Sequence, residues 1–163
     1  MPALRQAHTP QDAMQIAALA DSCWRSHYIP IIGEEQVNYM LATFQSAEAI
    51  ASQIADGRHY AFIDDDTSVS HGYLAIDDKD DHIFLSKLYI LPDSQGHGYG
   101  KWAIEQLRKN HPGRDIHLTV NKQNHHSIAF YQKCGFQIAD AIVTDIGHGF
   151  VMDDWVMVRK NTE

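Results

Sequence analysis

The feature that most constrains the fold is a glycine-rich turn between a predicted strand and a predicted helix. Residues 83–91 are predicted to form the strand, Pro92 ends it, and Gly96, Gly98 and Gly100 follow at every second position. Because glycine has no Cβ, the backbone can take left-handed angles there and approach a bulky anion closely. The N–H groups and the dipole at the start of a helix attract such an anion. This pattern predicts a phosphate-binding turn.

The order of the predicted elements indicates an α/β (α+β) fold. An antiparallel meander in the middle of the chain is followed by strand–helix–strand–helix order, which implies parallel pairing in the second half. We therefore expect a strongly twisted mixed sheet of about six or seven strands with helices on both faces, in a single domain spanning residues 1–163. The strands are predicted at 4–7, 60–63, 69–76, 83–91, 116–120, 136–144 and 155–158, and the helices at 10–28, 34–44, 47–55, 100–111 and 127–134.

The spacing of the turn distinguishes between phosphate-binding motifs. The dinucleotide fingerprint G-x-G-x-x-G needs a glycine where Lys101 stands. The P-loop needs a glycine in place of Gln95 and a hydroxyl residue in place of Trp102. The pattern that remains is [QR]-x-x-G-x-[GA], which Gln95, Gly98 and Gly100 satisfy. A plain loop that needs glycines to turn is the alternative.

Two blocks of sequence resemble the GNAT superfamily of acetyl-coenzyme A-dependent N-acetyltransferases. Residues 85–100 resemble the strand and pyrophosphate loop of that family, and residues 118–124 with 129–136 resemble its later strand and helix. The order and separation of the blocks also match. The resemblance implies a GNAT-like fold, acetyl-coenzyme A as co-substrate with no metal, and transfer of the acetyl group to a primary amine by direct attack in a ternary complex.

The resemblance also implies roles for individual residues. The strand residues Leu88, Tyr89 and Ile90 match the strand whose backbone pairs with the pantetheine arm. Asn124 matches a frequent coenzyme contact, and Tyr131 matches the tyrosine assigned as general acid. The residues that match the pyrophosphate loop and the helix start are Gln95, Gly96, His97, Gly98, Tyr99, Gly100 and Lys101.

The chemistry of this reaction suits these residue types. Attack of the amine on the thioester creates an oxyanion, which a strand N–H near Ile90 can stabilise. The departing thiolate needs a proton. A thiol has a pKa of about 8.5 and a tyrosine of about 10, so Tyr131 can donate a proton without being ionised beforehand. The alternative for Tyr131 is a ring that packs in the core.

One departure from the family pattern concerns the general base. Many members carry a glutamate on the strand before the phosphate loop, but the comparable stretch of residues 82–89 has no acid. Deprotonation of the amine can then run through water, or through a residue elsewhere. His82, His148 and Asp154 remain as candidates.

The ends of the chain indicate the class of acceptor. They mildly resemble members that acetylate polyamines and other small amines, through residues 152–157 and through the aromatic residues of the first helices, which are Trp24, Tyr28 and Tyr39. Asp153 and Asp154 can meet a cationic amine, or form a solvated turn. Two alternatives stay open: a protein N-terminal or lysine acetyltransferase, and a non-catalytic acyl-coenzyme A sensor.

Composition indicates which partners, metals and cellular location to expect. A net charge of −8 gives no general attraction to nucleic acid or anionic lipid, and no apolar run is long enough to span a membrane. The only cysteines, Cys23 and Cys134, lie far apart, and the eleven histidines show no metal-ligand spacing. We therefore expect a cytoplasmic protein without a metal. The family often forms homodimers, although nothing in this sequence specifies one.

Overall fold

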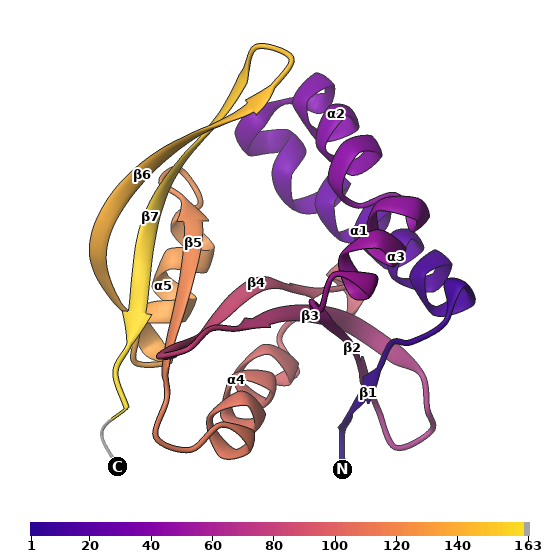
Figure 1. The fold of residues 1–163 in the computed structure, drawn as a ribbon, viewed down its shortest axis with the longest axis vertical. Coiled ribbons are helices and arrows are strands. Elements are labelled where there is room, and N and C mark those ends of the chain that lie inside the picture. The colour runs from indigo at the N-terminus through magenta and orange to yellow at the C-terminus, as the bar shows by residue number, and fades with distance from the viewer. Residues whose placement is uncertain (162–163) are drawn as a thin grey trace.

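The computed structural model describes residues 1–161, which form one mixed sheet flanked by helices (Figure 1). Seven strands lie in the order β1-β2-β3-β4-β5-β7-β6. All neighbours pair antiparallel except β4 and β5, as the predicted fold class requires. The strands are β1 Ala3–Gln6, β2 His59–Asp64, β3 Ser70–Asp78, β4 His82–Ile90, β5 Asp115–Asn121, β6 Gln137–Gly147 and β7 Phe150–Arg159; the helices are α1 Pro10–Ile32, α2 Glu34–Phe44, α3 Ala47–Ala55, the 3-10 turn η1 Pro92–Ser94, α4 Tyr99–Asn110 and α5 His125–Lys133.

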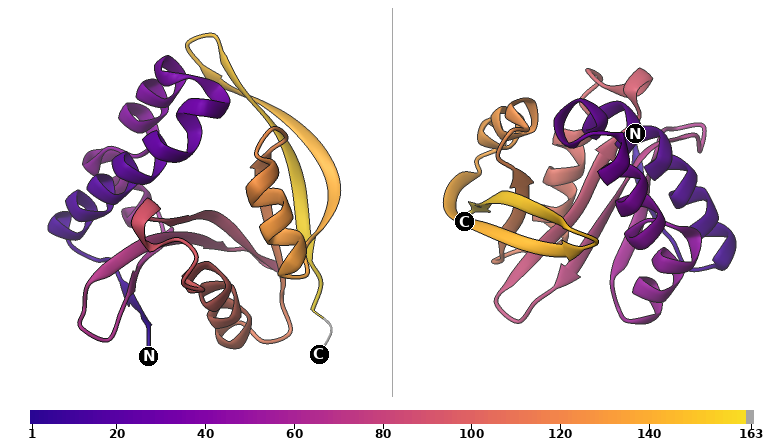
Figure 2. Two further views of the ribbon diagram at one scale, coloured as in Figure 1. Left: turned by 180° about the vertical axis from the view of Figure 1, so that it is seen from behind. Right: turned by 90° about the horizontal axis from the view of Figure 1, so that it is seen from above.

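The helices cover the two faces of the sheet separately. Helices α1, α2 and α3 pack on one face, where Ile16 and Trp24 join a core that includes Phe62 of the sheet. Helices α4 and α5 pack on the other face, where Ile104 and Ile128 are among the buried helix residues of a second core. Figures 1 and 2 show α1–α3 and α4 on opposite sides of the central strands. None of the helices within residues 1–161 combines the length and apolar character needed to cross a bilayer.

Local sequence signals set most helix starts. The side chain of Thr9 accepts from the N–H of Asp12, whose carboxylate accepts from the N–H of Thr9, so the predicted capping at Pro10 is confirmed. The side chain of Ser46 caps α3 by accepting from the N–H of Ala49. Helix α5 starts at His125, two residues before the predicted position, because Asn124 supplies the cap.

The end of α1 differs from the prediction. The helix runs to Ile32, past Tyr28 and through Pro30. Pro30 lacks an N–H, so the carbonyl of Ser26 loses its helical partner. The isoleucines that surround it pack against the core and keep this turn helical: Ile29, Ile31 and Ile32. Gly33 ends the helix instead, with φ of 87°.

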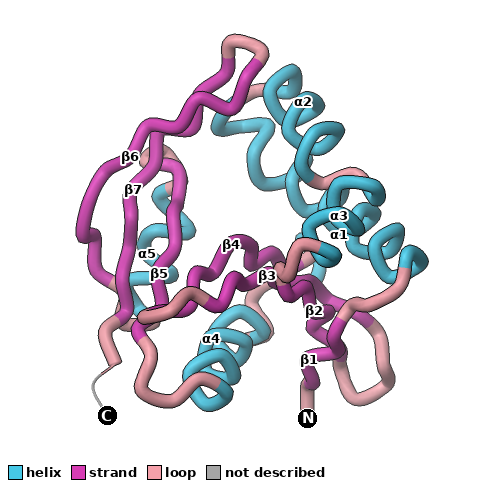
Figure 3. The backbone as a smooth tube through the Cα atoms, viewed as in Figure 1, coloured by secondary structure: helices cyan, strands magenta, loops and turns pink. Residues whose placement is uncertain are grey.

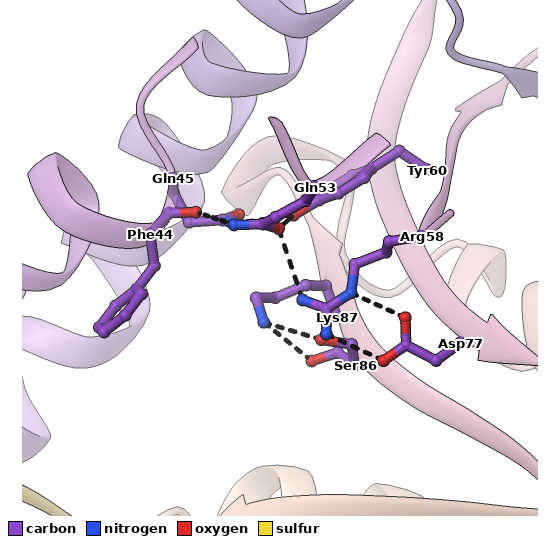
Figure 4. Close-up of polar contacts among 8 residues, drawn as sticks. All are labelled: Phe44, Gln45, Gln53, Arg58, Tyr60, Asp77, Ser86 and Lys87. Atoms are coloured by element: carbon purple, nitrogen blue, oxygen red, sulfur yellow. Dashed lines mark hydrogen bonds and ion pairs between the residues drawn. The ribbon is translucent and has the colours of Figure 1, made fainter. Parts of the chain in front are cut away.

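A polar network fixes the last part of this helical layer to the sheet (Figure 4). Gln53 of α3 donates to the carbonyl of Phe44 at 2.9 Å and accepts from the hydroxyl of Tyr60 at 2.6 Å. Arg58 forms two hydrogen bonds of 2.9 Å to the carboxylate of Asp77 on β3. Bidentate pairs of this kind hold both partners in one orientation. They anchor the helices against which β4 lies.

Strands β4 and β5 pair over only a short distance. The parallel ladder joins His82–Phe84 to Asp115–His117. Beyond these residues the strands diverge, as Figure 3 shows. The divergence leaves the second half of β4 and the end of β5 facing a space between them, at the point where the glycine-rich turn follows β4.

Candidate active site

The diverging strands enclose a cleft of about 350 Å³. Helix α1 and the start of α5 complete its walls. Nearly all of the residues predicted to bind coenzyme line it; His97 is not among the lining residues. The predicted residues that line the cleft are Leu88, Tyr89, Ile90, Gln95, Gly96, Gly98, Tyr99, Gly100, Lys101, Asn124 and Tyr131.

The glycine turn has the geometry of an anion cradle. Gly96 and Gly98 have φ of 82° and 84°, in the left-handed region that favours glycine. Gly98 is the N-cap residue of α4, without a side-chain cap, so the first N–H groups of the helix are open to a ligand. A Cβ on Gly100 would stand 3.0 Å from Cζ of Phe130. The turn therefore fits a pyrophosphate held by backbone N–H groups.

His71, which the sequence did not indicate as a site residue, contacts both ends of this turn. His71 Nδ1 lies 2.7 Å from the hydroxyl of Ser94, which is 8% exposed and lines the cleft. His71 Nε2 lies 2.7 Å from the carboxylate of Asp65, and this contact is the main cause that holds the pKa of Asp65 far below its usual range. The imidazole also stacks on Tyr99 with a centroid distance of 4.6 Å. The β2–β3 turn thus positions the start of α4.

Asn124 has two roles that its sequence position does not reveal. Its side-chain oxygen accepts from the N–H of Ser127 at 3.2 Å and caps α5. Its Nδ2 donates to Nε2 of His27 on α1 at 2.8 Å. Burial, followed by the nearby charge of His126, lowers the pKa of His27, which keeps the ring neutral and able to accept. His27 also lines the cleft, and its spacing from Trp24 on one helix face was the signal that could have indicated it.

Tyr131 lies on α5 with its ring against Phe130 and Phe136. It lines the cleft as well as packing on the core, and its role as general acid stays a prediction. Burial is the main cause that raises the pKa of Tyr131 above that of a free tyrosine. The hydroxyl therefore carries its proton at neutral pH.

Two further tyrosines form the wall on the α1 side. The hydroxyls of Tyr28 and Tyr89 lie 2.9 Å apart. Trp24 packs against both rings, and its indole N–H donates to the buried hydroxyl of Tyr73 at 3.1 Å. Tyr73 in turn donates to Gln45 at 2.7 Å. This aromatic cluster fixes the position of α1 relative to β4.

The three candidate bases lie in different places. His82 stacks on His117 at 3.8 Å, where β4 and β5 still pair, and contacts Asp81. His148 is exposed at the tip of the β6–β7 hairpin. Asp154 is buried on β7, opposite the end of β5. Asp154 is the only one of these three candidates that is buried, and none of the three is among the residues that line the cleft.

Asp153 and Asp154 point to different faces of β7. Asp153 is half exposed and pairs with Lys122 at 3.0 Å, and it lies within strand β7 and not in a solvated turn. Asp154 is 5% exposed, and within residues 1–161 its Oδ1 has no hydrogen-bond partner. Burial, then the charge of Asp153, raises the pKa of Asp154 to about 6, and Lys122 opposes the shift.

The β6–β7 hairpin closes over helix α2. Tyr39 donates to the carbonyl of Ile146 at 2.6 Å and stacks on His148. Gln36 donates to the carbonyl of Val151 at 3.1 Å. Figure 1 shows the tip of the hairpin beside α2. The two ends of the chain that were predicted to form the acceptor wall are thus in contact.

Comparison with known proteins identifies this arrangement. The model of the Acetyltransferase (GNAT) family matches residues 16–136. The chain belongs to the GNAT family of acetyltransferases. A peptidyl-lysine N-acetyltransferase, YjaB of Salmonella typhimurium, is 31% identical over an alignment of 84 residues that covers 46% of this chain and 57% of that protein. The chain thus spans little more than half the length of this GNAT relative.

Solved GNAT structures show the same fold. The PaiA N-acetyltransferase from Thermoplasma acidophilum, crystallised with coenzyme A, superposes with a TM-score of 0.79 at 22% identity, covering 98% of this chain and 99% of that one. A chimera of the spermidine N-acetyltransferase SpeG from Vibrio cholerae and hSSAT gives a TM-score of 0.72 at 16% identity, covering 99% and 96%. Among residues 1–161 of this GNAT chain, no three His, Cys, Asp or Glu side chains are grouped so as to hold a metal ion.

Proposed function

We propose that this protein transfers the acetyl group of acetyl-coenzyme A to a small primary amine, in a ternary complex. The observation that supports the acceptor class is the closed hairpin. Tyr39 and Gln36 bind the β6–β7 hairpin to α2. A protein segment would need an open groove at this position, whereas a small amine fits a closed pocket. The name of the spermidine N-acetyltransferase among the structural neighbours agrees with this acceptor class.

The cleft supplies the groups that this reaction needs. The turn of residues 95–101 holds the pyrophosphate through backbone N–H groups and the dipole of α4. The backbone of residues 88–90, which has no β5 partner, binds the pantetheine arm. An N–H of this strand near Ile90 stabilises the oxyanion. Asn124 holds the start of α5, and with it Tyr131, against α1 through His27.

Tyr131 provides the proton for the departing sulfur. Its raised pKa keeps the hydroxyl protonated until the thiolate forms beside it. Replacing Tyr131 by Phe keeps the packing of the ring and removes only the hydroxyl. General acids contribute about 10²–10⁴-fold to rate, so we expect kcat to fall by about 100-fold or more while the dissociation constant of coenzyme A stays within about threefold.

The experiment is thiol release from acetyl-coenzyme A with a panel of acceptors. The panel contains propylamine, spermidine, a lysine-containing peptide and a peptide with a free N-terminus. Turnover with the small amines and none with the peptides is the expected result. Unchanged turnover in Tyr131→Phe would remove this residue as the acid.

Lysine acetylation is the second candidate, and the name of the YjaB relative favours it. Turnover confined to the lysine peptide would replace the small amine by a lysine side chain as acceptor. The missing strand glutamate favours a third candidate, a sensor that binds acyl-coenzyme A without catalysis. Tight binding of coenzyme A with no turnover of any amine would support the sensor.

A further inference from the structure

The strongest unexplained feature outside the coenzyme cleft is the buried carboxylate of Asp154. It is 5% exposed, and within the described residues its Oδ1 accepts no hydrogen bond. A buried charge without a partner is costly, so proteins retain one mainly where it serves a ligand. The groups whose charges act on it are Asp153 on the same strand and Lys122 after β5. Lys122 already pairs with Asp153.

The strand geometry shows which side of the sheet Asp154 faces. Side chains alternate along a strand, so Asp154 shares a face with Met152. Met152 packs against the core formed with α1 and α2. Trp155 and Met157 point the other way, into the core formed with α4 and α5. Asp154 therefore faces α1 and α2, on the opposite side of the sheet from Tyr131 and α4.

Tyr28 connects this carboxylate with the coenzyme cleft. Tyr28 lines the cleft, and its hydroxyl lies 2.9 Å from that of Tyr89 on the splayed part of β4. Burial raises the pKa of Tyr28 to about 12, the hydrogen bond from Tyr89 opposes the rise, and the negative charge of Asp154 adds to it. The carboxylate is thus within electrostatic reach of the wall of the cleft. Asp154 itself does not line the cleft, so an acceptor that contacts it would lie on the α1 side of β7, next to Tyr28.

We propose that Asp154 binds the ammonium group of the acceptor and takes the proton that this group must lose before it attacks. This assignment rests on the proposed function and specifies the base that the strand of residues 82–89 lacks. The acceptor is an aliphatic primary amine, because a compact ammonium can pair with a single buried carboxylate. The orphan Oδ1 gains its hydrogen bond from the ammonium.

The proton balance follows from this placement. The carboxylate of Asp154 takes one proton from R–NH₃⁺, and the free nitrogen attacks the thioester carbon. The new C–N bond forms and the C–S bond breaks. The sulfur receives the proton of Tyr131, and the second proton lost by the nitrogen replaces it on Tyr131. Asp154 then releases its proton to solvent, so that ammonium and thioester give amide, thiol and one proton.

The acidity of the site suits this role. A raised pKa of about 6 makes Asp154 a stronger base than a surface carboxylate, while it stays ionised at neutral pH. Catalytic bases work best when their pKa is near the working pH. Binding of the ammonium also neutralises the buried charge, so the carboxylate is best stabilised when the substrate is present.

The test compares Asp154→Asn with Asp153→Asn in the full-length protein. Asn keeps the shape of the side chain and removes the charge. Asp153 carries the same group on the exposed face of the same strand, so it is the matched control. Rates with propylamine and spermidine are measured from pH 5 to 9, and the dissociation constant of coenzyme A checks that each variant is folded.

We expect Asp154→Asn to lower kcat by about 100-fold or more, to raise KM for the amine, and to remove the acidic limb of the kcat profile. Asp153→Asn should keep rates within about threefold and retain the acidic limb, moved slightly to lower pH because the charge of Asp153 contributes to the raised pKa of Asp154. Equal activity and an unchanged pH profile in Asp154→Asn would overturn the assignment and leave the proposed function intact. A loss of coenzyme binding in Asp154→Asn identifies a structural role and also overturns it.

The site can still be tested if the protein proves not to be an amine acetyltransferase. If the wild type turns over no amine, calorimetric titration of propylamine into the complex with coenzyme A still tests the site. Binding that Asp154→Asn weakens tenfold or more, and Asp153→Asn leaves unchanged, supports an amine site. Binding that is absent or equal in all three proteins overturns it.

Discussion

The buried charge of Asp154 makes a prediction about stability that is independent of catalysis. Because burial raises its pKa, the folded state binds a proton on this carboxyl more tightly than the unfolded chain does. Linkage then requires that stability falls as the pH rises from the unfolded value of 3.8 through the folded value of about 6. The variant Asp154→Asn carries no such charge, so it escapes this loss.

The magnitude follows from the shift. A rise of about two units corresponds to about 3 kcal/mol at 1.36 kcal/mol per unit. This figure is reduced by water at the exposed part of the side chain and by relaxation of the site. We therefore expect a stability difference of roughly 1–3 kcal/mol between Asp154→Asn and the wild type. Both side chains leave a buried polar atom without a partner, and this cost cancels in the comparison. At about 2–4 °C per kcal/mol, Asp154→Asn should melt several degrees above the wild type at pH 7.5.

The assay is urea unfolding of both proteins at intervals between pH 4 and 8. The stability difference should be small near pH 4, where Asp154 is protonated in the folded protein, and should grow to its full value above pH 7. Asp153→Asn loses an exposed ion pair and one of the charges that raise the pKa of Asp154, so it should change stability by about 1 kcal/mol or less and retain most of the wild-type pH dependence. A variant Asp154→Asn that is no more stable than the wild type at pH 7.5, or a difference that does not change with pH, would refute the reasoning.

Two other substitutions test the supports of the cleft. His71→Phe keeps a ring on Tyr99 and removes both hydrogen bonds of the imidazole, so coenzyme A measured by calorimetry should bind about fivefold to tenfold more weakly, with about 1 kcal/mol lost. Tyr73→Phe leaves the indole N–H of Trp24 and the amide of Gln45 buried without their partner, so the free energy of unfolding in urea should fall by about 2–4 kcal/mol.

Each of these has a control within the chain. His117→Phe keeps the stack on His82 at the paired end of β4, so coenzyme binding should not change. An equal loss of affinity in His117→Phe and His71→Phe would contradict a specific role for His71. A loss of less than 1 kcal/mol in Tyr73→Phe would mean that water replaces its hydroxyl.

The features that could be predicted were those that depend on residues close together in the sequence. The glycine turn and the cap at Thr9 each need only a few consecutive side chains, and the element order fixed the fold class. The course of α1 through Pro30 was not predictable in this way. Its continuation depends on isoleucines that become buried only when the tertiary structure forms.

The candidate site was predictable to a smaller extent. Motif positions indicated residues that are predicted to bind coenzyme, and all of these except His97 line the cleft. The contacts of Asn124 with His27 and of Ser94 with His71 join residues far apart in sequence, so no local pattern indicated them. The choice of Asp154 from the candidate bases needed burial, which depends on the whole packing of β7 against α1.

The short ladder between β4 and β5 has a consequence for the mechanics of the molecule. Three residue pairs join two half-sheets, one formed by β1–β4 and the other by β5–β7. Each half has its own antiparallel ladders, so the seam is the place where the two can shift relative to each other. A ligand in the cleft contacts both halves. It therefore stiffens the seam, as additional pairing between β4 and β5 would. Part of the binding free energy then stabilises the seam, so the protein should resist local opening most strongly when its cleft is filled.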